Sequence, residues 1–349
     1  MRPFEFQTPD SVQSVLVAND TPPEAVAAPK DGSMFHAGGT NLVDLMKIGV
    51  VRPSKLVSVN TALPSDVREE NGALIVGAGC RMSGLADHDA VRTRFPVVRQ
   101  ALVLAASPQI RNMASVGGNL LQRTRCPYFR DISYPCNKRE PGTGCPAIKG
   151  DHRNLAILGT SDACIATHPG DFAIALVALD ASLDLKGPSG DRSVKLREFY
   201  KLPGNTPHVE NDLKPGELIV GIRIPGSAAA TRSFYHKVRD RASYAFALTS
   251  AAVGLEFDGQ TIKDARVALG GVGAIPWHAK EAEQALIGKP ATLDTFSAAA
   301  DAALRDATPL PENKFKVPLA KATLVRALQR LAEHGPVSDQ ELWHMQHGR

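Results

Sequence analysis

Long apolar runs, aromatic residues and an excess of charge of one sign are all scarce in this sequence. No apolar run approaches about 18 residues, the length of a membrane-spanning helix, so we expect no membrane insertion. Aromatic residues make up 5% of the chain and the formal net charge is +4, which argues against a nucleic-acid partner. The start, MRPFEFQTPDSVQ, has neither an apolar core nor a twin arginine, so we expect no export signal on this chain.

The chain is long enough for more than one packed core. It has 349 residues, of which 43% are hydrophobic, and helical and strand patterns are interspersed along it. The small-residue linker GSAAATR predicts a boundary near residue 226. We therefore predict a mixed α and β fold with a first part, 1–225, in two lobes of about 1–60 and 61–225, and a second part, 226–349.

Local signals place several elements within these parts. Ser11 is a plausible N-cap for a helix over PDSVQSVLVAN. A hairpin is predicted around GPSG at 187–190, and a second one around Asp258-Gly259. The apolar stretch FAIALVALDA predicts a helix with Asp171 at its N-cap, and two further helices close the chain. We expect the end that carries His344 and His347 to be frayed and assign these histidines no role.

Four of the five cysteines lie within 39 residues of one another, at Cys126, Cys136, Cys145 and Cys164. They are separated by nine, eight and eighteen residues, so the short C-x₂₋₄-C knuckle of structural zinc sites is missing. A disulfide framework belongs to small secreted domains. An iron–sulfur cluster takes four thiolates at wide spacings, whereas buried free thiols are the bland alternative. The fifth cysteine, Cys80, falls outside the group and reads as a buried small residue.

The charge of the cysteine-rich stretch favours an anionic occupant. Between Leu121 and Arg153 there are seven basic and three acidic residues, an excess equal to the net charge of the whole chain. Nearby cations stabilise thiolate ligands. The same charge also fits a solvated loop or a surface that docks an acidic partner, so these alternatives stay open.

Two glycine-rich turns have the composition of phosphate-binding loops. The first is HAGGTNL at 36–42 and the second is ASVGGNL at 114–120. Paired glycines let backbone amides approach an anion closely. Neither turn is a G-x-G-x-x-G fingerprint or a Walker loop, so neither a classical Rossmann site nor a nucleoside-triphosphate hydrolase is indicated. Each turn alone could equally be a tight turn.

Longer stretches of the chain resemble a known family. AGGTNLVDLMK, ASVGGNLL, HPGDFAIALVALDA, GELIVGIRIP and FYHKVRDRASYAFALTSAAV are similar to the FAD-binding medium subunit of the molybdenum hydroxylases, the xanthine dehydrogenase family. The resemblance runs from about residue 4 to about residue 332. Within the family, the stretch RTRCPYFRD…PCNKR and the later CIATHP resemble the FAD and 4Fe–4S subunit of bacterial periplasmic aldehyde oxidoreductases. The flavoprotein subunit of 4-hydroxybenzoyl-CoA reductases is the nearest alternative.

The resemblance implies a fold and a set of site residues. The fold would be α+β, with a two-lobed FAD-binding domain of the vanillyl-alcohol-oxidase type, an iron–sulfur loop at about 121–165 and a smaller C-terminal α+β domain. The implied FAD contacts are Ala37, Gly38, Gly39, Thr40, Asn41, Leu42, Ser115, Gly118, Asn119, Asp171, Ile219 and Lys237. The implied 4Fe–4S ligands are Cys126, Cys136, Cys145 and Cys164. We identify no catalytic side chain in this chain.

The same resemblance implies partners and a place for the complex. The chain would join a large molybdenum-cofactor subunit and a small 2Fe–2S subunit in a heterotrimeric aldehyde oxidoreductase and pass electrons through FAD to an external acceptor. Export with a signal-bearing partner would put it in the periplasm, and the cytoplasm is the alternative. Other hypotheses are a xanthine dehydrogenase-like complex, a stand-alone flavin oxidase and a zinc-stabilised binding module.

Overall fold

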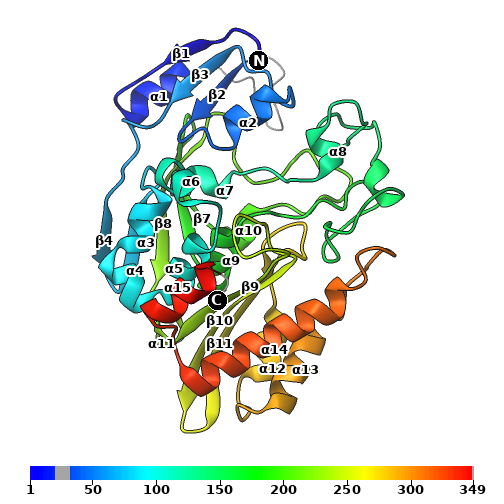
Figure 1. Ribbon diagram of the computed structural model, residues 1–349. Coiled ribbons are helices and arrows are strands. Elements are labelled where there is room, and N and C mark those ends of the chain that lie inside the picture. The colour runs from blue at the N-terminus through cyan, green and yellow to red at the C-terminus, as the bar shows by residue number, and fades with distance from the viewer. Residues whose placement is uncertain (20–31, 348–349) are drawn as a thin grey trace.

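The computed structural model describes residues 1–19 and 32–347, and its fold is built around three β-sheets (Figure 1). Each sheet packs against helices, so the predicted α+β class is confirmed. The sheets follow one another along the chain, from the blue N-terminal strands to the yellow strands near the C-terminal helices.

The first sheet is small and parallel, with strand order β1-β3-β2. Its strands are β1 (Glu5–Gln7), β2 (Ser33–His36) and β3 (Lys55–Ser58), and its helices are α1 (Val12–Ala18) and α2 (Leu42–Lys47). The predicted cap of α1 is confirmed, because Ser11 Oγ accepts a hydrogen bond from Ser14 N at 3.2 Å. The first glycine-rich turn connects β2 to α2.

The second sheet is antiparallel and has the order β4-β5-β8-β6-β7. Its strands are β4 (Val67–Glu70), β5 (Ala73–Gly77), β6 (Ser182–Gly187), β7 (Gly190–Lys195) and β8 (Leu218–Pro225). The predicted hairpin at 187–190 is confirmed as the β6–β7 turn. The accompanying helices are α3 (Met82–Asp87), α4 (Asp89–Arg94), α5 (Pro96–Val103), α6 (Pro108–Met113), α7 (Val116–Leu120), α9 (Asp171–Ala178) and α10 (Leu196–Phe199).

Helix α9 forms the centre of the molecule. All eight of its residues are buried, and it packs against α5, β10 and β11, which belong to different parts of the chain. A helix that is apolar on every side needs such surroundings. The expectation that Asp171 is its N-cap is wrong. Gly170 occupies the cap position, and the Asp171 carboxylate makes no cap hydrogen bond because it is engaged elsewhere.

The cysteine-rich segment between α7 and α9 is mostly irregular, as its sequence predicts. It contains only the short helix α8 (Pro127–Arg130) and the 3-10 turn Pro146–Ile148, and it extends to one side of the ribbon in green (Figure 1). Arg130 fastens α8 to α2 through Asp44, with 2.7 Å between Nη1 and Oδ2. The segment is therefore attached to the helix that follows the first glycine-rich turn.

The third sheet, of order β12-β11-β10-β9, is antiparallel. Its strands are β9 (Ser233–Val238), β10 (Thr249–Asp258), β11 (Thr261–Gly270) and β12 (Trp277–His278). The predicted hairpin at Asp258-Gly259 is confirmed as the β10–β11 turn. The helices of this part are α11 (Ala228–Thr231), α12 (Lys280–Leu286), α13 (Leu293–Ala303) and α14 (Lys316–His334), and α14 packs on β10.

A last helix, α15 (Asp339–His347), returns from the third part to the second (Figure 1). The expectation of a frayed end at His344 is wrong, because the chain is helical there. Asp339 forms ion pairs with Arg92 of α4 and Arg99 of α5, and Leu342 is buried. No helix within the described ranges is long and apolar enough to cross a membrane.

Candidate functional site

A large cavity of about 900 Å³ opens where the three sheets meet. This volume is in the range of small-molecule and cofactor sites. The twelve residues predicted to bind a cofactor all line it, although they come from five separate stretches of the chain. They are Ala37, Gly38, Gly39, Thr40, Asn41, Leu42, Ser115, Gly118, Asn119, Asp171, Ile219 and Lys237.

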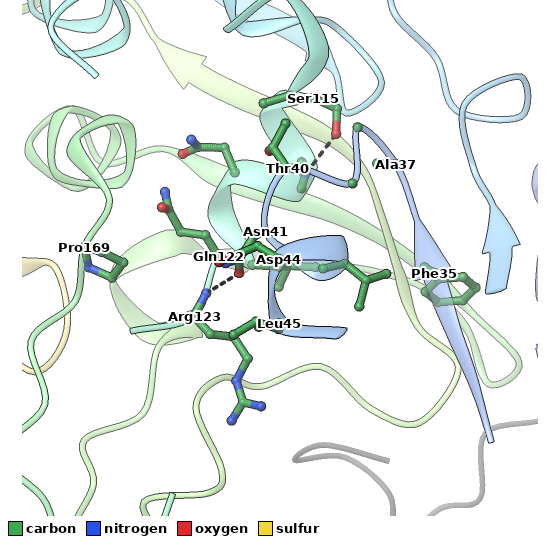
Figure 2. Close-up of a pocket in the computed structure, with 18 of the residues that line it drawn as sticks. Phe35, Ala37, Thr40, Asn41, Asp44, Leu45, Ser115, Gln122, Arg123 and Pro169 are labelled. Carbon is green, nitrogen blue, oxygen red and sulfur yellow. Dashed lines mark hydrogen bonds between the residues drawn. The ribbon is translucent and has the colours of Figure 1, made fainter. Parts of the chain in front are cut away.

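The two glycine-rich turns form one continuous wall of this cavity. At Gly38 the backbones are so close that an added Cβ would lie 2.0 Å from the carbonyl oxygen of Met113, just before the second turn. Gly39 has a φ of +71°, a conformation that glycine adopts without strain. Figure 2 shows Thr40 of the first turn close to Ser115 of the second. The missing side chain of Gly38 therefore lets the two turns pack backbone against backbone.

Asn60 and Arg81 hold the two turns together from behind. Asn60 Nδ2 donates to the carbonyl oxygen of Ala37 at 3.0 Å, and Arg81 Nη2 donates to Asn60 Oδ1 at 3.1 Å. Arg81 Nη1 also donates to the carbonyl oxygen of Met113 at 2.5 Å. This chain of hydrogen bonds fixes the backbone of both turns before any ligand arrives.

In two asparagines of the cavity wall, one side-chain polar atom has a hydrogen-bond partner and the other has none among the described residues. Asn41 Oδ1 accepts from Arg123 N at 2.9 Å, shown as a dashed line in Figure 2, whereas its buried Nδ2 has no partner among the described residues. Asn119 Nδ2 lies 3.3 Å from Met82 Sδ, and its buried Oδ1 is likewise unpartnered in the described part of the chain. Buried polar atoms are rarely left unpaired in native structures. A polar ligand in the cavity would satisfy both, so the site fits a nucleotide-like cofactor.

A buried ion pair closes another part of the cavity. Lys237 Nζ lies 2.7 Å from Asp171 Oδ2, and the two side chains are 1% and 6% exposed. Lys237 also donates to the carbonyl oxygen of Leu104 at 3.1 Å. The Tyr235 hydroxyl donates to Asp171 Oδ1 at 2.7 Å and can accept from Ser250 Oγ, which is 2.9 Å away. Burial and the Asp171 charge together raise the pKa of Tyr235 well above its ordinary value.

Two stretches of the cavity wall were missed by sequence reasoning. Residues 208–217 contribute His208 and Glu210, and residues 241–246 contribute Tyr244 and Phe246. Neither stretch forms a helix or a strand, so neither has the hydrophobic periodicity by which elements are recognised in a sequence. The Arg125 guanidinium lies 5.0 Å from the centre of the Phe246 ring and also lines the cavity. Burial lowers the pKa of Arg125 to about 10, with the nearby Arg130 adding to the effect.

The four clustered cysteines line a second, much smaller cavity together, here called the cysteine cavity. Cys126, Cys136 and Cys164 are buried and Cys145 is partly buried. Several backbone amides point at the sulfurs: those of Phe129 and Tyr128 at Cys126, and that of Ala166 at Cys164, where the N–S distance is 3.5 Å. Such amide–sulfur hydrogen bonds surround thiolate-bound iron–sulfur clusters.

Burial disfavours the thiolate form of Cys126 and Cys164 in this cavity. Burial raises the pKa of Cys126 to about 12 and that of Cys164 to about 11, because the charged thiolate is poorly solvated there. Lys138 opposes this effect at Cys164. In the described ranges, no three cysteine, histidine or carboxylate side chains are grouped so that they could hold a metal ion. As predicted, Cys80 is buried and lies outside the cysteine cavity.

Two family models together span almost the whole chain. Residues 2–227 match the model described as the FAD binding domain in molybdopterin dehydrogenase, and residues 233–331 match the CO dehydrogenase flavoprotein C-terminal domain. The aldehyde oxidoreductase FAD-binding subunit PaoB of Escherichia coli K12 is 47% identical over 88% of this chain and 95% of its own length. The carbon monoxide dehydrogenase medium chain of Hydrogenophaga pseudoflava is 26% identical over 93% of this chain and 96% of its own length.

Solved structures share the architecture. A carbon monoxide dehydrogenase from Oligotropha carboxidovorans superposes with a TM-score of 0.72 over 95% of this chain and 99% of that one, at 24% identity. Quinoline 2-oxidoreductase from Pseudomonas putida also reaches a TM-score of 0.72, over 95% of this chain and 98% of its own, at 23% identity. At these identities the likeness shows the fold.

Proposed function

Because the chain belongs to the FAD-binding medium subunits of the molybdenum hydroxylase family, we propose that it is the FAD- and 4Fe–4S-binding subunit of a heterotrimeric, molybdenum-dependent aldehyde oxidoreductase. The observation that carries the FAD part is the large cavity, since all twelve residues implied by the family resemblance line it. The aldehyde part rests on the relative from Escherichia coli, which is 47% identical over nearly its full length.

Different residues of the large cavity would contact different parts of FAD. The amides of the turns at 37–42 and 115–119 would take the pyrophosphate, and Asn41 Nδ2 and Asn119 Oδ1 would gain the partners they lack. The Asp171–Lys237 pair would hold a polar edge of the cofactor from a fixed position. FAD supplies the ability to accept electrons in pairs and to release them singly or in pairs.

The cysteine cavity would hold the 4Fe–4S cluster through Cys126, Cys136, Cys145 and Cys164. A four-iron cluster takes one thiolate for each iron, so its ligands need not converge on one ion. The support for this assignment is that the four cysteines line one cavity together. The amide–sulfur hydrogen bonds would stabilise the thiolates once iron displaces their protons.

In this proposal the substrate is oxidised on another chain. Aldehyde oxidation would take place on the large molybdenum-cofactor subunit, and electrons would come through the 2Fe–2S centres of a small subunit to this chain and leave to an external acceptor. The conversion of an aldehyde and water to a carboxylic acid releases two electrons and two protons. This chain would contribute the binding sites, their electrostatics and the exclusion of bulk water.

The experiment is a cofactor measurement on the complex purified anaerobically with its partner subunits. We expect one FAD and about four irons for each copy of this chain, beyond those of the small subunit. Cys136→Ser should remove this iron, whereas Cys80→Ser, the matched control outside the cavity, should keep it. Full iron in Cys136→Ser would contradict the ligand assignment.

Different cofactor contents or activities would favour the other hypotheses. Zinc in place of iron, with FAD retained, would make the cysteine segment structural. Turnover of a substrate by this chain alone would indicate a stand-alone flavin oxidase. Activity of the complex on purines or on a hydroxybenzoyl thioester, and none on aldehydes, would favour a xanthine dehydrogenase-like or 4-hydroxybenzoyl-CoA reductase-like complex.

We also propose that the complex works in the periplasm and that a signal-bearing partner carries this chain there. The support is the resemblance to periplasmic aldehyde oxidoreductases. Cell fractionation is the test: the chain should reach the periplasm when it is co-expressed with its small subunit and stay in the cytoplasm when the signal of that partner is deleted. A cytoplasmic location in both cases would reject the proposal.

A further inference from the structure

A cluster of three charged side chains joins the large cavity to the cysteine cavity. Arg123 and Glu210 line the large cavity, and Lys138 lines the cysteine cavity. Arg123 Nη2 lies 2.6 Å from Glu210 Oε1 and Arg123 Nε lies 3.0 Å from the same atom. Lys138 Nζ lies 3.6 Å from that oxygen on its other side. One carboxylate oxygen is thus shared by a cation from each cavity.

The surroundings keep these charges in place and away from bulk water. The side chains of Arg123, Lys138 and Glu210 are 12%, 13% and 23% exposed. Lys138 Nζ donates to the carbonyl oxygen of Pro207 at 2.9 Å, and the carbonyl oxygen of Glu210 accepts from Lys201 N at 3.0 Å. Burial by itself would raise the pKa of Glu210, but Arg123 and Lys138 outweigh burial and hold it below the ordinary value.

Each cation also reaches the interior of one site. Lys138 lines the cysteine cavity together with Cys164. The Arg123 guanidinium lies 4.5 Å from the centre of the Phe129 ring, and the backbone amide of Phe129 points at Cys126. Arg123 N donates to Asn41 in the first glycine-rich turn. The cluster is therefore in contact with the walls of both cavities.

We propose that Glu210 is a shared charge-tuning residue, whose single negative charge sets the reduction potentials of the groups in both cavities. The inference rests on the proposed function, because it takes FAD and an iron–sulfur cluster as the two occupants. The ion pairs of Glu210 are with Arg123 and Lys138, and it acts on the two cavities through these cations. It is a positioning residue and not a catalytic one.

The sign of the effect follows from electrostatics. Reduction adds negative charge to each occupant, and a carboxylate nearby opposes that addition. Charges in a site of low solvent access interact more strongly than charges in water. If Glu210 is made neutral, Arg123 and Lys138 remain uncompensated, so the reduced forms of both occupants should become more favourable.

The test is a redox titration of the complete complex that carries Glu210→Gln. The flavin is followed by its absorbance and the cluster by electron paramagnetic resonance. We expect both potentials to rise, with a threefold to tenfold shift of each one-electron equilibrium toward the reduced form, up to about 59 mV. Glu210→Asp, which keeps the charge, should restore most of each potential. Asp240→Asn removes an exposed carboxylate paired with Arg153 and should leave both potentials unchanged.

Every result of this titration decides the proposal. Unchanged potentials in Glu210→Gln, or a shift of only one group, would overturn the shared role. If the Glu210→Gln complex fails to assemble, Lys138→Met is the second variant. Both potentials should then fall, and the cluster potential should fall more than the flavin potential. Unchanged potentials in Lys138→Met would also overturn the proposal. The iron and FAD contents of the unsubstituted complex are measured separately, so a failure of the proposed function is recognised independently.

Discussion

At Gly38, one methyl group decides whether the two glycine-rich turns can pack. An added Cβ would lie 2.0 Å from the Met113 carbonyl oxygen and 2.9 Å from Ala114 Cα, both of which are backbone atoms that cannot rotate away. The second turn would have to move as a unit. The hydrogen bonds from Arg81 and Asn60 that tie the turns together oppose such a movement.

Gly38→Ala should therefore lower both stability and FAD content. Overpacking of this kind typically costs about 1–3 kcal/mol, and the displaced turn would lose its contacts with the pyrophosphate. Differential scanning fluorimetry and flavin quantification of the purified complex measure the two effects. Gly84→Ala in α3 is the control, because an added Cβ there meets nothing within 4 Å. Full flavin occupancy in Gly38→Ala would reject the pyrophosphate assignment.

Some residues of the site could be predicted from the sequence, and others could not. The glycine-rich turns and the clustered cysteines stand out in the sequence, and the family resemblance then assigns them a role. The Asp171–Lys237 contact joins residues 66 positions apart, and in sequence Lys237 looks like an ordinary surface lysine. Glu210 gives no local signal either, since its partner Arg123 is 87 positions away. Contacts of this kind exist only after the sheets have packed.

Among the elements, the β6–β7 hairpin depends on an ion-pair network with the residue before β8. Arg192 of β7 donates to both carboxylate oxygens of Glu217, from Nε to Oε1 at 2.6 Å and from Nη2 to Oε2 at 2.7 Å. Lys214 N also donates to Oε2 at 2.7 Å. The hydrogen bonds from Arg192 hold the pKa of Glu217 below its ordinary value of 4.5. Glu217 lines the large cavity, so the network also fixes the cavity wall.

This network predicts an acid-sensitive contribution to stability. A carboxylate with a lowered pKa in the folded state contributes stability above the unfolded-state value of 4.5, and loses it as the pH falls through the folded-state value. Glu217→Gln should cost about 2 kcal/mol at pH 7. Its melting temperature should approach that of the unsubstituted protein as the pH falls below 4.5.

The control comes from the same hairpin. Asp191 pairs with Lys186 at 2.7 Å, but its side chain is 64% exposed. An exposed pair contributes little, so Asp191→Asn should change the melting temperature only slightly at any pH. A Glu217→Gln protein whose deficit stays constant as the pH falls from 7 to well below 4.5 would show that the ionisation of Glu217 is not responsible.

Helices and turns that have local sequence signals can be predicted from the sequence. Elements that depend on tertiary contacts cannot. The cap at Ser11 and the turn at Asp258-Gly259 satisfy their own backbone groups, so their residues suffice to predict them. Helix α15 is different. Its sequence, DQELWHMQH, has no apolar stripe, and its place depends on partners as distant as Arg92 and Arg99. Hydrophobic periodicity, which predicts amphipathic helices, therefore does not predict α15.

At the scale of the whole molecule, α15 joins the second and third sheets. Asp339 pairs with Arg92 and Arg99, whereas Glu341 pairs with Arg330 of α14 at 2.7 Å. Met345 packs against the hydrophobic cores of both parts. Arg239, which follows β9, donates to the Met345 carbonyl oxygen at 3.3 Å.

Deletion of residues 337–349 should loosen the packing of these two parts. Loss of the buried Leu342 side chain alone is worth about 2–5 kcal/mol, so we expect the melting temperature to fall by several degrees. Gln340→Ala, a change at an exposed position of the same helix, should have little effect. A deleted protein with an unchanged melting temperature would mean that α15 does not bind the two parts together.

The irregular segment 123–126 borders both cavities. Arg123 and Arg125 line the larger one, and Cys126 lines the smaller one. Any occupant that orders this short segment lowers the entropy cost of filling the neighbouring site. Such linkage is reciprocal by thermodynamic necessity. Under the proposed function, insertion of one prosthetic group would therefore favour insertion of the other.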